Sequence, residues 1–154
     1  YNQANMVLIV LDNSTTAMTG HQPHPGTGQT VMGEIVQKIN IEQVLRGIGV
    51  TEIETINPLE LEASVSCVKR MAEKSGVRAI IFKAPCIAVT KPKAPLHVDQ
   101  DSCIGCKKCI RDLGCPAIVM NDGKICIDAS MCTGCHLCSQ VCPVCAIAGG
   151  DNHE

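Results

Sequence analysis

The 154-residue sequence predicts an α/β domain followed by a smaller, cysteine-rich α+β domain that is built around metal. Two short apolar runs, MVLIVL and VRAIIF, alternate with segments of helical period in the first part of the chain. Of the 12 cysteines, 10 lie between Cys103 and Cys145, and a proline-containing segment without periodicity precedes them. We therefore expect the α/β domain over residues 1–90, a linker over residues 91–96 and the cysteine-rich domain over residues 97–150.

The α/β domain is expected to begin with a buried parallel strand and a long polar loop. Met6–Leu11 is a continuous aliphatic run, which is typical of a strand covered on both faces. The segment LDNSTTAMTGHQPHPGTGQT follows, and a loop of this length is more often functional than a plain connector. Asp12 and Asn13 lie just past the carboxyl end of the strand, where open α/β sheets place ligands. Oxygen atoms here suit Mg²⁺ beside a phosphate, but Asp and Asn also form ordinary turns, so both interpretations remain open.

Four further elements complete the α/β pattern. Glu34–Gly47 predicts one or two helical turns with an interruption near Asn40, and Thr51–Ile56 predicts a second strand. Residues 58–76 predict a helix, because apolar residues recur at helical spacing between an N-terminal proline and a C-cap glycine. Val77–Phe82 predicts a third strand. This order of strands and helices is typical of a doubly wound or related α/β layer.

The overall composition excludes two classes of partner. A formal net charge of -2 and a pI near 6.2 give no basic surface for nucleic acid. No apolar run approaches the roughly 18–20 residues of a membrane span, and MVLIVL is too short for a signal peptide. We therefore expect a cytoplasmic protein that binds neither nucleic acid nor membrane.

An internal repeat organises the cysteine-rich domain. CIGCKKCIRDLGCPAI begins at Cys103, and CTGCHLCSQVCPVCAI begins at Cys132. Each copy has three cysteines separated by two residues, then a short spacer, a Cys-Pro pair and a closing Ala-Ile. In two-cluster ferredoxins such a run wraps three thiolates around one iron–sulfur cube, and its Cys-Pro cysteine ligates the other cube. The proline fixes φ and turns the chain away from the cluster.

On this scheme each [4Fe-4S] cluster takes cysteines from both copies. The ligands predicted for cluster I are Cys103, Cys106, Cys109 and Cys142. The ligands predicted for cluster II are Cys132, Cys135, Cys138 and Cys115. The first copy departs from the usual spacing, because five residues rather than three separate Cys109 from Cys115.

Zinc is the alternative metal, because paired C-x-x-C motifs also build zinc ribbons. Zinc would leave the third cysteine and the Cys-Pro pair of both copies unexplained, so the pattern favours iron–sulfur clusters. Cysteines outside the pattern are expected to be small buried hydrophobic residues: Cys67, Cys86, Cys126 and Cys145.

The polar loop and the cysteine repeat together resemble the 2-oxoacid:ferredoxin oxidoreductases. LDNSTTAMTGHQPHPGTG is similar to the thiamine-diphosphate loop of that family, most closely its arylpyruvate (indolepyruvate) branch. The order of thiamine domain, RAIIFKAPC-like strand, linker and double cluster matches essentially the whole chain. The resemblance implies a partial thiamine-diphosphate-binding domain over residues 1–90, then a 2[4Fe-4S] ferredoxin-like domain. It also implies that Asn13 and the Thr15 carbonyl bind Mg²⁺, and that Gly20 and His21 lie close to thiamine diphosphate.

The family resemblance also implies a reaction and its partners. An arylpyruvate such as indolepyruvate would be oxidatively decarboxylated, its acyl group would pass to coenzyme A, and electrons would pass through the clusters to an external ferredoxin. A smaller β subunit would complete the enzyme. A two-cluster electron-transfer protein without catalysis of its own is the alternative function from a different class.

One part of the family's Mg²⁺ site is not found at its usual place. The family has a Gly-Asp motif upstream of the Asn, whereas 12 residues precede Asn13 and the sole Gly-Asp is Gly150-Asp151. We therefore expect the chain to correspond to the C-terminal part of the family's subunit, and to bind clusters without turning over substrate alone.

Overall fold

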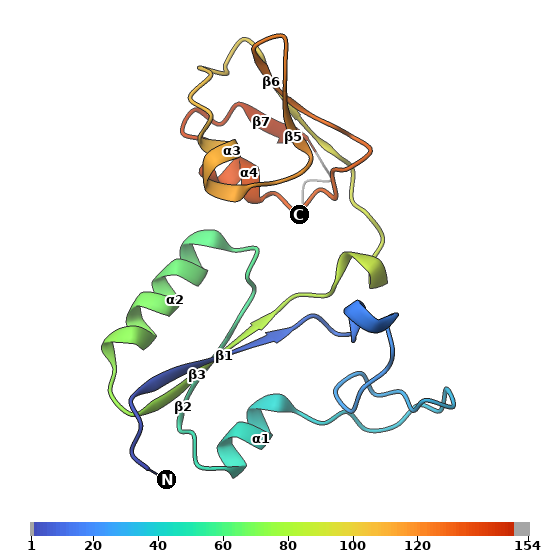
Figure 1. The fold of residues 1–154 in the computed structure, drawn as a ribbon, viewed down its shortest axis with the longest axis vertical. Coiled ribbons are helices and arrows are strands. Elements are labelled where there is room, and N and C mark those ends of the chain that lie inside the picture. Colours follow the sequence, from blue (N-terminus) through green and yellow to red (C-terminus); the bar gives the residue numbers. More distant parts are fainter. Residues whose placement is uncertain (1, 150–154) are drawn as a thin grey trace. The chain divides into compact units, whose positions relative to one another are not determined.

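The computed structural model describes residues 2–149, which form two compact units (Figure 1). The first unit ends at Thr90 and the second begins at Lys91. The expected order of an α/β domain and a smaller α+β domain is confirmed. The predicted domain end at residue 150 and the Gly150-Asp151 pair lie outside the described residues. Within residues 2–149, every helix is too short or too polar to cross a membrane.

A three-stranded parallel sheet forms the centre of the first unit, with strand order β1-β3-β2 (Figure 1). Its elements, in chain order, are β1 (Met6–Asp12), η1 (Ala17–Thr19), α1 (Ile41–Gly47), β2 (Glu52–Ile56), α2 (Leu61–Glu73), β3 (Val77–Lys83) and η2 (Ile87–Val89). The central strand, β3, packs α1 residues against one face and α2 residues against the other, because successive side chains alternate between faces. Ala79 and Ile81 join Leu45 and Val50 in one core cluster. Ile80 joins Cys67 and Met71 of α2 in the other.

The structure corrects the expected burial of β1. In the described residues β1 pairs with β3 alone and forms an edge of the sheet, so Ile9 is 48% and Leu11 76% exposed. The aliphatic run did predict a strand in a parallel sheet, but one neighbouring strand covers less of it than two would.

Two helices begin later than predicted, because asparagine side chains form local turns. Residues 34–40 are not helical, and α1 begins at Ile41, where the Asn40 side chain accepts a hydrogen bond from the Gln43 N–H (3.1 Å). Likewise α2 begins only after a turn in which the Leu59 N–H donates to Asn57 Oδ1 (3.0 Å). The helix ends at Glu73, three residues before the predicted C-cap glycine.

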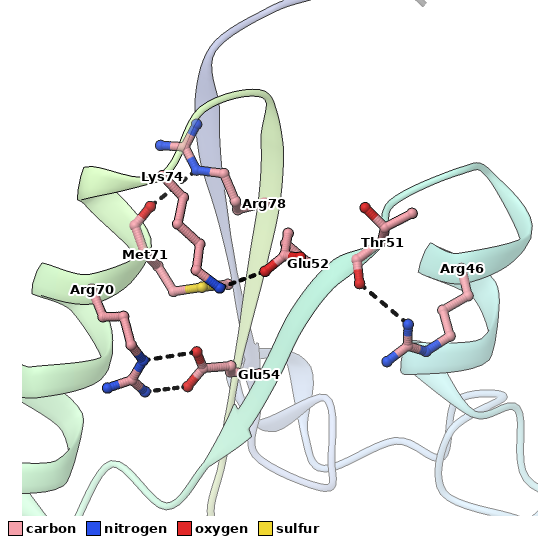
Figure 2. Close-up of polar contacts among 8 residues, drawn as sticks. All are labelled: Arg46, Thr51, Glu52, Glu54, Arg70, Met71, Lys74 and Arg78. Atoms are coloured by element: carbon pink, nitrogen blue, oxygen red, sulfur yellow. Dashed lines mark hydrogen bonds and ion pairs between the residues drawn. The ribbon is translucent and has the colours of Figure 1, made fainter.

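Charged side chains fasten α2 to β2. Arg70 forms a bidentate ion pair with Glu54, and Lys74 forms an ion pair with Glu52 (Figure 2). The hydrogen bond from Arg70 holds the pKa of Glu54 below its usual value. Burial, and then the hydrogen bond with Glu54, raise the pKa of the Cys67 thiol.

Arg78 is a buried cation at the start of β3, with only 3% of its surface exposed. Its Nε donates to the carbonyl of Met71 at 3.0 Å (Figure 2), and its guanidinium also donates to the Gly76 carbonyl and the Asn5 side chain. Because a buried charge needs hydrogen-bonding partners, this arrangement holds the end of α2 and the turn before β3 together.

The second unit consists of two β pairs and two short helices. In chain order they are β4 (Leu96–Val98), α3 (Lys108–Leu113), β5 (Ile118–Asn121), β6 (Lys124–Ile127), α4 (Leu137–Val141) and β7 (Ile147–Gly149). Strand β4 pairs antiparallel with β7, so the two ends of the unit meet, and β5 pairs antiparallel with β6 as a hairpin. Helices α3 and α4, one from each copy of the repeat, contact each other.

Replacing Ile80 by alanine is expected to destabilise the first unit by about 2–5 kcal/mol, because the side chain is completely buried between β3 and α2. Ile9→Ala removes the same atoms at the paired position of β1, where the side chain is half exposed, and should cost much less. Hydrogen exchange of the whole chain would measure both effects, with residues 96–149 as the internal reference. Equal loss of protection in the two variants would contradict this core assignment.

Candidate functional site

The two copies of the cysteine repeat begin in the same way. Asp99 and Asp128 each lie four residues before the first cysteine of a copy. The N–H of Cys103 donates to the Asp99 carbonyl, and the N–H of Cys132 donates to the Asp128 carbonyl, both at 3.0 Å. A serine hydroxyl holds the pKa of each of the two carboxyls below its usual value. Each cluster loop therefore starts from a turn closed by an aspartate.

Residues with positive φ then bend the chain in both cysteine runs. Gly105 and Gly134 have φ of 64° and 68°, and Lys107 and His136 have φ of 60° and 62°. Successive N–H groups in such turns converge and form an anion-binding concavity. The third cysteine of each copy follows in the first turn of α3 or α4 and is buried.

A cavity in the second unit is lined by all four cysteines that the repeat predicts for cluster I: Cys103, Cys106, Cys109 and Cys142. Lys107 and apolar side chains from β4, β6 and β7 also line it. Burial raises the pKa of the Cys109 thiol, and the charges of Cys106 and Cys142 raise it further. Cys142, from the second copy, therefore lies among the cysteines of the first copy.

The reciprocal arrangement holds for the other predicted set. Burial, and then the charges of Cys135, Cys132 and Cys115, raise the pKa of Cys138 to about 11. Cys115, from the first copy, therefore lies close enough to act on the cysteines of the second. Burial alone therefore disfavours the Cys138 thiolate, whereas a bound metal centre deprotonates its thiol ligands.

Backbone N–H groups are directed at two of these sulfur atoms. Leu96 N–H donates to Cys132 Sγ at 3.5 Å, and Ala146 N–H donates to Cys142 Sγ at 3.3 Å. Hydrogen bonds to sulfur stabilise thiolate ligands and help to set the potential of an iron–sulfur cluster. In addition, His136 Nε2 is buried and has no hydrogen-bonding partner among the described residues. Both cysteine sets thus fit a bound cluster.

The described residues hold no group of three or more His, Cys, Asp or Glu side chains arranged around a single metal ion. A [4Fe-4S] cube binds its four thiolates at four separate irons, so its ligands need not converge on one point.

The cysteines outside the repeat pattern differ in how deeply they are buried. Cys67 is completely buried, as expected of a small hydrophobic residue, whereas Cys86 and Cys126 are only half-buried. Cys145 contradicts the expectation, because it is exposed. It lies in a tight turn with φ of 53°, and its N–H donates to the Cys142 carbonyl at 3.3 Å, which places it outside the core.

In the first unit, a cleft opens at the carboxyl end of the sheet. Asp12, Thr55 and Lys83 come from the ends of β1, β2 and β3, and Lys38 and Asn40 come from the segment before α1. Lys83 Nζ lies 3.9 Å from the Asp12 carboxylate. Ligands of parallel α/β sheets bind at this edge. The cleft offers both carboxylate and ammonium groups to a charged ligand.

The four residues predicted near thiamine diphosphate lie in the loop after β1. Asn13 Oδ1 accepts a hydrogen bond from the Thr15 N–H at 3.2 Å, so one turn contains both residues, and Thr15 is buried. Gly20 and His21 lie together in the next turn, where the His21 N–H donates to the Thr16 carbonyl at 3.0 Å. The cleft is lined by Asp12 and by none of these four.

Sequence reasoning missed three residues that line this cleft. Thr55 and Lys83 lie at the ends of predicted strands, so the rule that ligands bind at carboxyl ends could have found them. Lys38 lies in a segment without regular structure, and no sequence signal indicated its position.

Comparison with protein families assigns both units. Residues 1–82 match the family model described as "Thiamine pyrophosphate enzyme, C-terminal TPP binding domain". Residues 96–143 match the model described as "4Fe-4S dicluster domain". The cofactors of these domains are therefore thiamine diphosphate and two [4Fe-4S] clusters, and the second unit is a two-cluster ferredoxin-like domain.

Similar curated proteins all carry the name "Indolepyruvate oxidoreductase subunit IorA". The protein of Methanothermobacter thermautotrophicus is 44% identical over 149 residues, which is 96% of this chain and 24% of that protein. The protein of Archaeoglobus fulgidus is 39% identical over 153 residues, covering 96% of this chain and 25% of that protein. The protein of Thermococcus kodakarensis is 40% identical, covering 93% and 24%. No solved structure was found to match.

The chain thus spans about a quarter of the length of these relatives, and its similarity to them extends over both units. The parallel sheet with a cleft at its carboxyl edge corresponds to the first matched model, and the two cysteine sets correspond to the second. The chain therefore belongs to the thiamine pyrophosphate enzyme family, with a C-terminal TPP binding domain followed by a 4Fe-4S dicluster domain.

Proposed function

We propose that the chain is the C-terminal part of a thiamine-dependent 2-oxoacid:ferredoxin oxidoreductase that acts on arylpyruvates, with indolepyruvate as the leading substrate. The observation that carries this proposal is one chain that combines a TPP binding domain with two crossed sets of four cysteines. The names of the relatives support indolepyruvate as the substrate. A smaller β subunit, coenzyme A and an external ferredoxin complete the proposed system.

Thiamine diphosphate, when bound, supplies carbanion stabilisation for decarboxylation, and the clusters carry electrons one at a time. In the first unit, Asn13 would offer its side-chain oxygen to Mg²⁺ and Thr15 its backbone carbonyl. The hydrogen bond between the two residues uses one lone pair of Asn13 Oδ1 and leaves the other for a metal. Lys38 and Lys83 supply positive charge to the cleft, where it would balance a diphosphate.

In the second unit, each cluster would be held by three cysteines of one copy and one cysteine of the other. Cluster I would take Cys103, Cys106, Cys109 and Cys142. Cluster II would take Cys132, Cys135, Cys138 and Cys115. The hydrogen bonds to Cys132 and Cys142 sulfur would orient these thiolates and raise the reduction potentials.

Pairs of cysteine substitutions distinguish crossed from uncrossed ligation. Cys115→Ala combined with Cys132→Ala removes two ligands of the same cluster and is expected to leave one intact [4Fe-4S] cluster. Cys115→Ala combined with Cys103→Ala damages both clusters and should leave none. Iron and sulfide analysis and electron paramagnetic resonance of the reduced chain would count intact clusters, relative to about eight irons in the unmodified chain.

Cys126→Ala and Cys145→Ala serve as controls, because both cysteines lie outside the two proposed sets. Both variants are expected to keep the full iron content and both cluster signals. If the Cys115/Cys132 pair abolished both clusters while the Cys115/Cys103 pair kept one, ligation would be uncrossed.

Asn13→Ala is expected to raise the Mg²⁺ concentration needed for half-maximal thiamine diphosphate binding by about tenfold or more, because one of few protein ligands is lost. The measurement is a thiamine diphosphate titration of the assembled oxidoreductase at several Mg²⁺ concentrations. Asn121→Ala, in the second unit, is the matched control and should leave the titration unchanged. An unaltered Mg²⁺ requirement in Asn13→Ala would remove this residue from the metal site.

The substrate assignment is tested by reduction of ferredoxin in the presence of coenzyme A, thiamine diphosphate and Mg²⁺. The oxidoreductase assembled from the whole subunit and its β partner should prefer indolepyruvate over pyruvate and 2-oxoglutarate by about tenfold or more in kcat/KM. The 154-residue chain alone is expected to bind clusters but to show no turnover. A preference for pyruvate would contradict the arylpyruvate assignment, and steady turnover by the chain alone would contradict the second expectation.

A further inference from the structure

The two cluster loops differ in how much of each is accessible to solvent. We call residues 103–108 loop I and residues 132–137 loop II. Four consecutive residues of loop I are exposed together with Ile104, which is 65% exposed: Gly105, Cys106, Lys107 and Lys108. All residues of loop II are buried or half-buried. The left-handed positions of the two loops have nearly the same φ, whereas the segments that surround each loop differ.

The chain segment before β4 covers loop II. Lys93 N–H donates to the Thr133 carbonyl at 3.4 Å, and Leu96 N–H reaches the sulfur of Cys132. A Cβ atom placed on Gly134 would lie only 2.7 Å from the Ala94 carbonyl oxygen. At Gly105, the equivalent position of loop I, an added Cβ would meet no atom within 4 Å. Loop II is therefore closed by its own domain, and loop I is open.

Loop I and the helix after it also carry positive charge. The exposed side chains of Lys107, Lys108 and Arg111 form a cationic patch. At the equivalent positions the second copy has His136, Leu137 and Gln140, none of which is a lysine or an arginine. Asp112 is the one acidic residue within residues 103–112, so this segment keeps a net charge of +2 (three cations minus one anion). Nearby acidic residues outside the segment are Asp99 and Asp101, and Asp99 is engaged by the Ser102 hydroxyl.

We propose that loop I and the cationic patch form the docking surface for a small acidic electron-carrier protein, and that cluster I is the exit for electrons. The inference rests on the proposed function, because it requires that Cys103, Cys106 and Cys109 hold a reducible cluster. In the transfer step, the reduced cluster gives up one electron and passes from its 1+ to its 2+ state. The carrier's redox centre gains that electron, and no proton is needed for balance.

Charge and exposure both favour this surface over loop II. An acidic carrier is repelled by the negative charge of a thiolate-ligated cluster, and three cations beside cluster I offset that repulsion. Opposite charges also steer the carrier and raise the rate of encounter. The exposed side chain of Ile104, in the same loop, offers an apolar contact from which water is excluded on docking.

The experiment uses the full chain, reconstituted with iron and sulfide, reduced with dithionite and freed of excess reductant. Oxidised flavodoxin is the acidic one-electron acceptor, and its flavin absorbance reports electron transfer in a stopped-flow spectrometer. The patch variant is Lys108→Glu, which reverses an exposed charge at the first residue of α3 and leaves Lys107, whose side chain lines the cavity of cluster I, unchanged. Arg111 is kept, since it donates to the Cys106 carbonyl at 3.3 Å. Lys69→Glu, on α2 of the first unit, is the control with the same change of exposed charge elsewhere.

The patch variant should transfer electrons to flavodoxin with a second-order rate constant about fivefold or more below that of the unmodified chain at low ionic strength. The difference should shrink as salt is added, and the control should stay within about twofold of the unmodified chain. A small neutral quinone should oxidise all three proteins equally, which would show that their clusters are intact.

The outcomes separate the docking surface from the proposed function. Equal rates to flavodoxin in the patch variant and the control would overturn the docking inference while leaving the clusters in place. Slower oxidation of the patch variant by the quinone as well would also overturn it, because the defect would then lie in the cluster. Failure of the unmodified chain to form reducible clusters would instead overturn the proposed function.

Discussion

Under the proposed ligation, the second unit depends on one constraint: each group of three cysteines takes its fourth ligand from the other copy of the repeat. Cys142 lines the cavity formed by the first copy, and Cys115 lies within electrostatic reach of the second. This exchange requires the copies to fold together, and the strand pairing reflects it, because β4 and β7 join the ends of the unit. Helices α3 and α4, which carry the buried third cysteines of the two copies, contact each other. A domain this small needs such a link between its two halves, because its apolar core alone contributes limited stability.

The first unit depends instead on the burial of one strand. With Ala79 and Ile81 on one face of β3 and Ile80 on the other, both helices pack against the same strand. Burial is concentrated at the centre of the sheet, and Arg78 joins the end of α2 to the strand that follows. The carboxyl ends of all three strands then meet at one edge, where Asp12, Thr55 and Lys83 line the cleft.

Cysteine spacing and aliphatic runs were sufficient to predict the two domains, because both are local patterns with a direct structural meaning. The repeat predicted which cysteines gather, including Cys115 despite its longer spacer, and the structure brings those side chains together. Local turns were harder to predict, since Asn40 and Asn57 decide where two helices begin through side-chain hydrogen bonds. The exposure of Cys145 and of the β1 side chains was not predictable either, because it depends on which other segments of the chain cover them. The asymmetry between the loops has the same origin, because the segment before β4 lies over only one of them.

The segment that covers loop II also leaves only a short chain connection between the two units. Thr90 is tied to the first unit through its hydroxyl, which donates to the Cys86 carbonyl, and Lys93 is already bonded to the Thr133 carbonyl of the second. Only Lys91 and Pro92 lie between these anchors, and the proline ring removes one rotatable bond. So short a tether corresponds to an effective concentration of about millimolar or above for one unit near the other. The chain itself thereby keeps the two domains together, without any affinity between their surfaces being required.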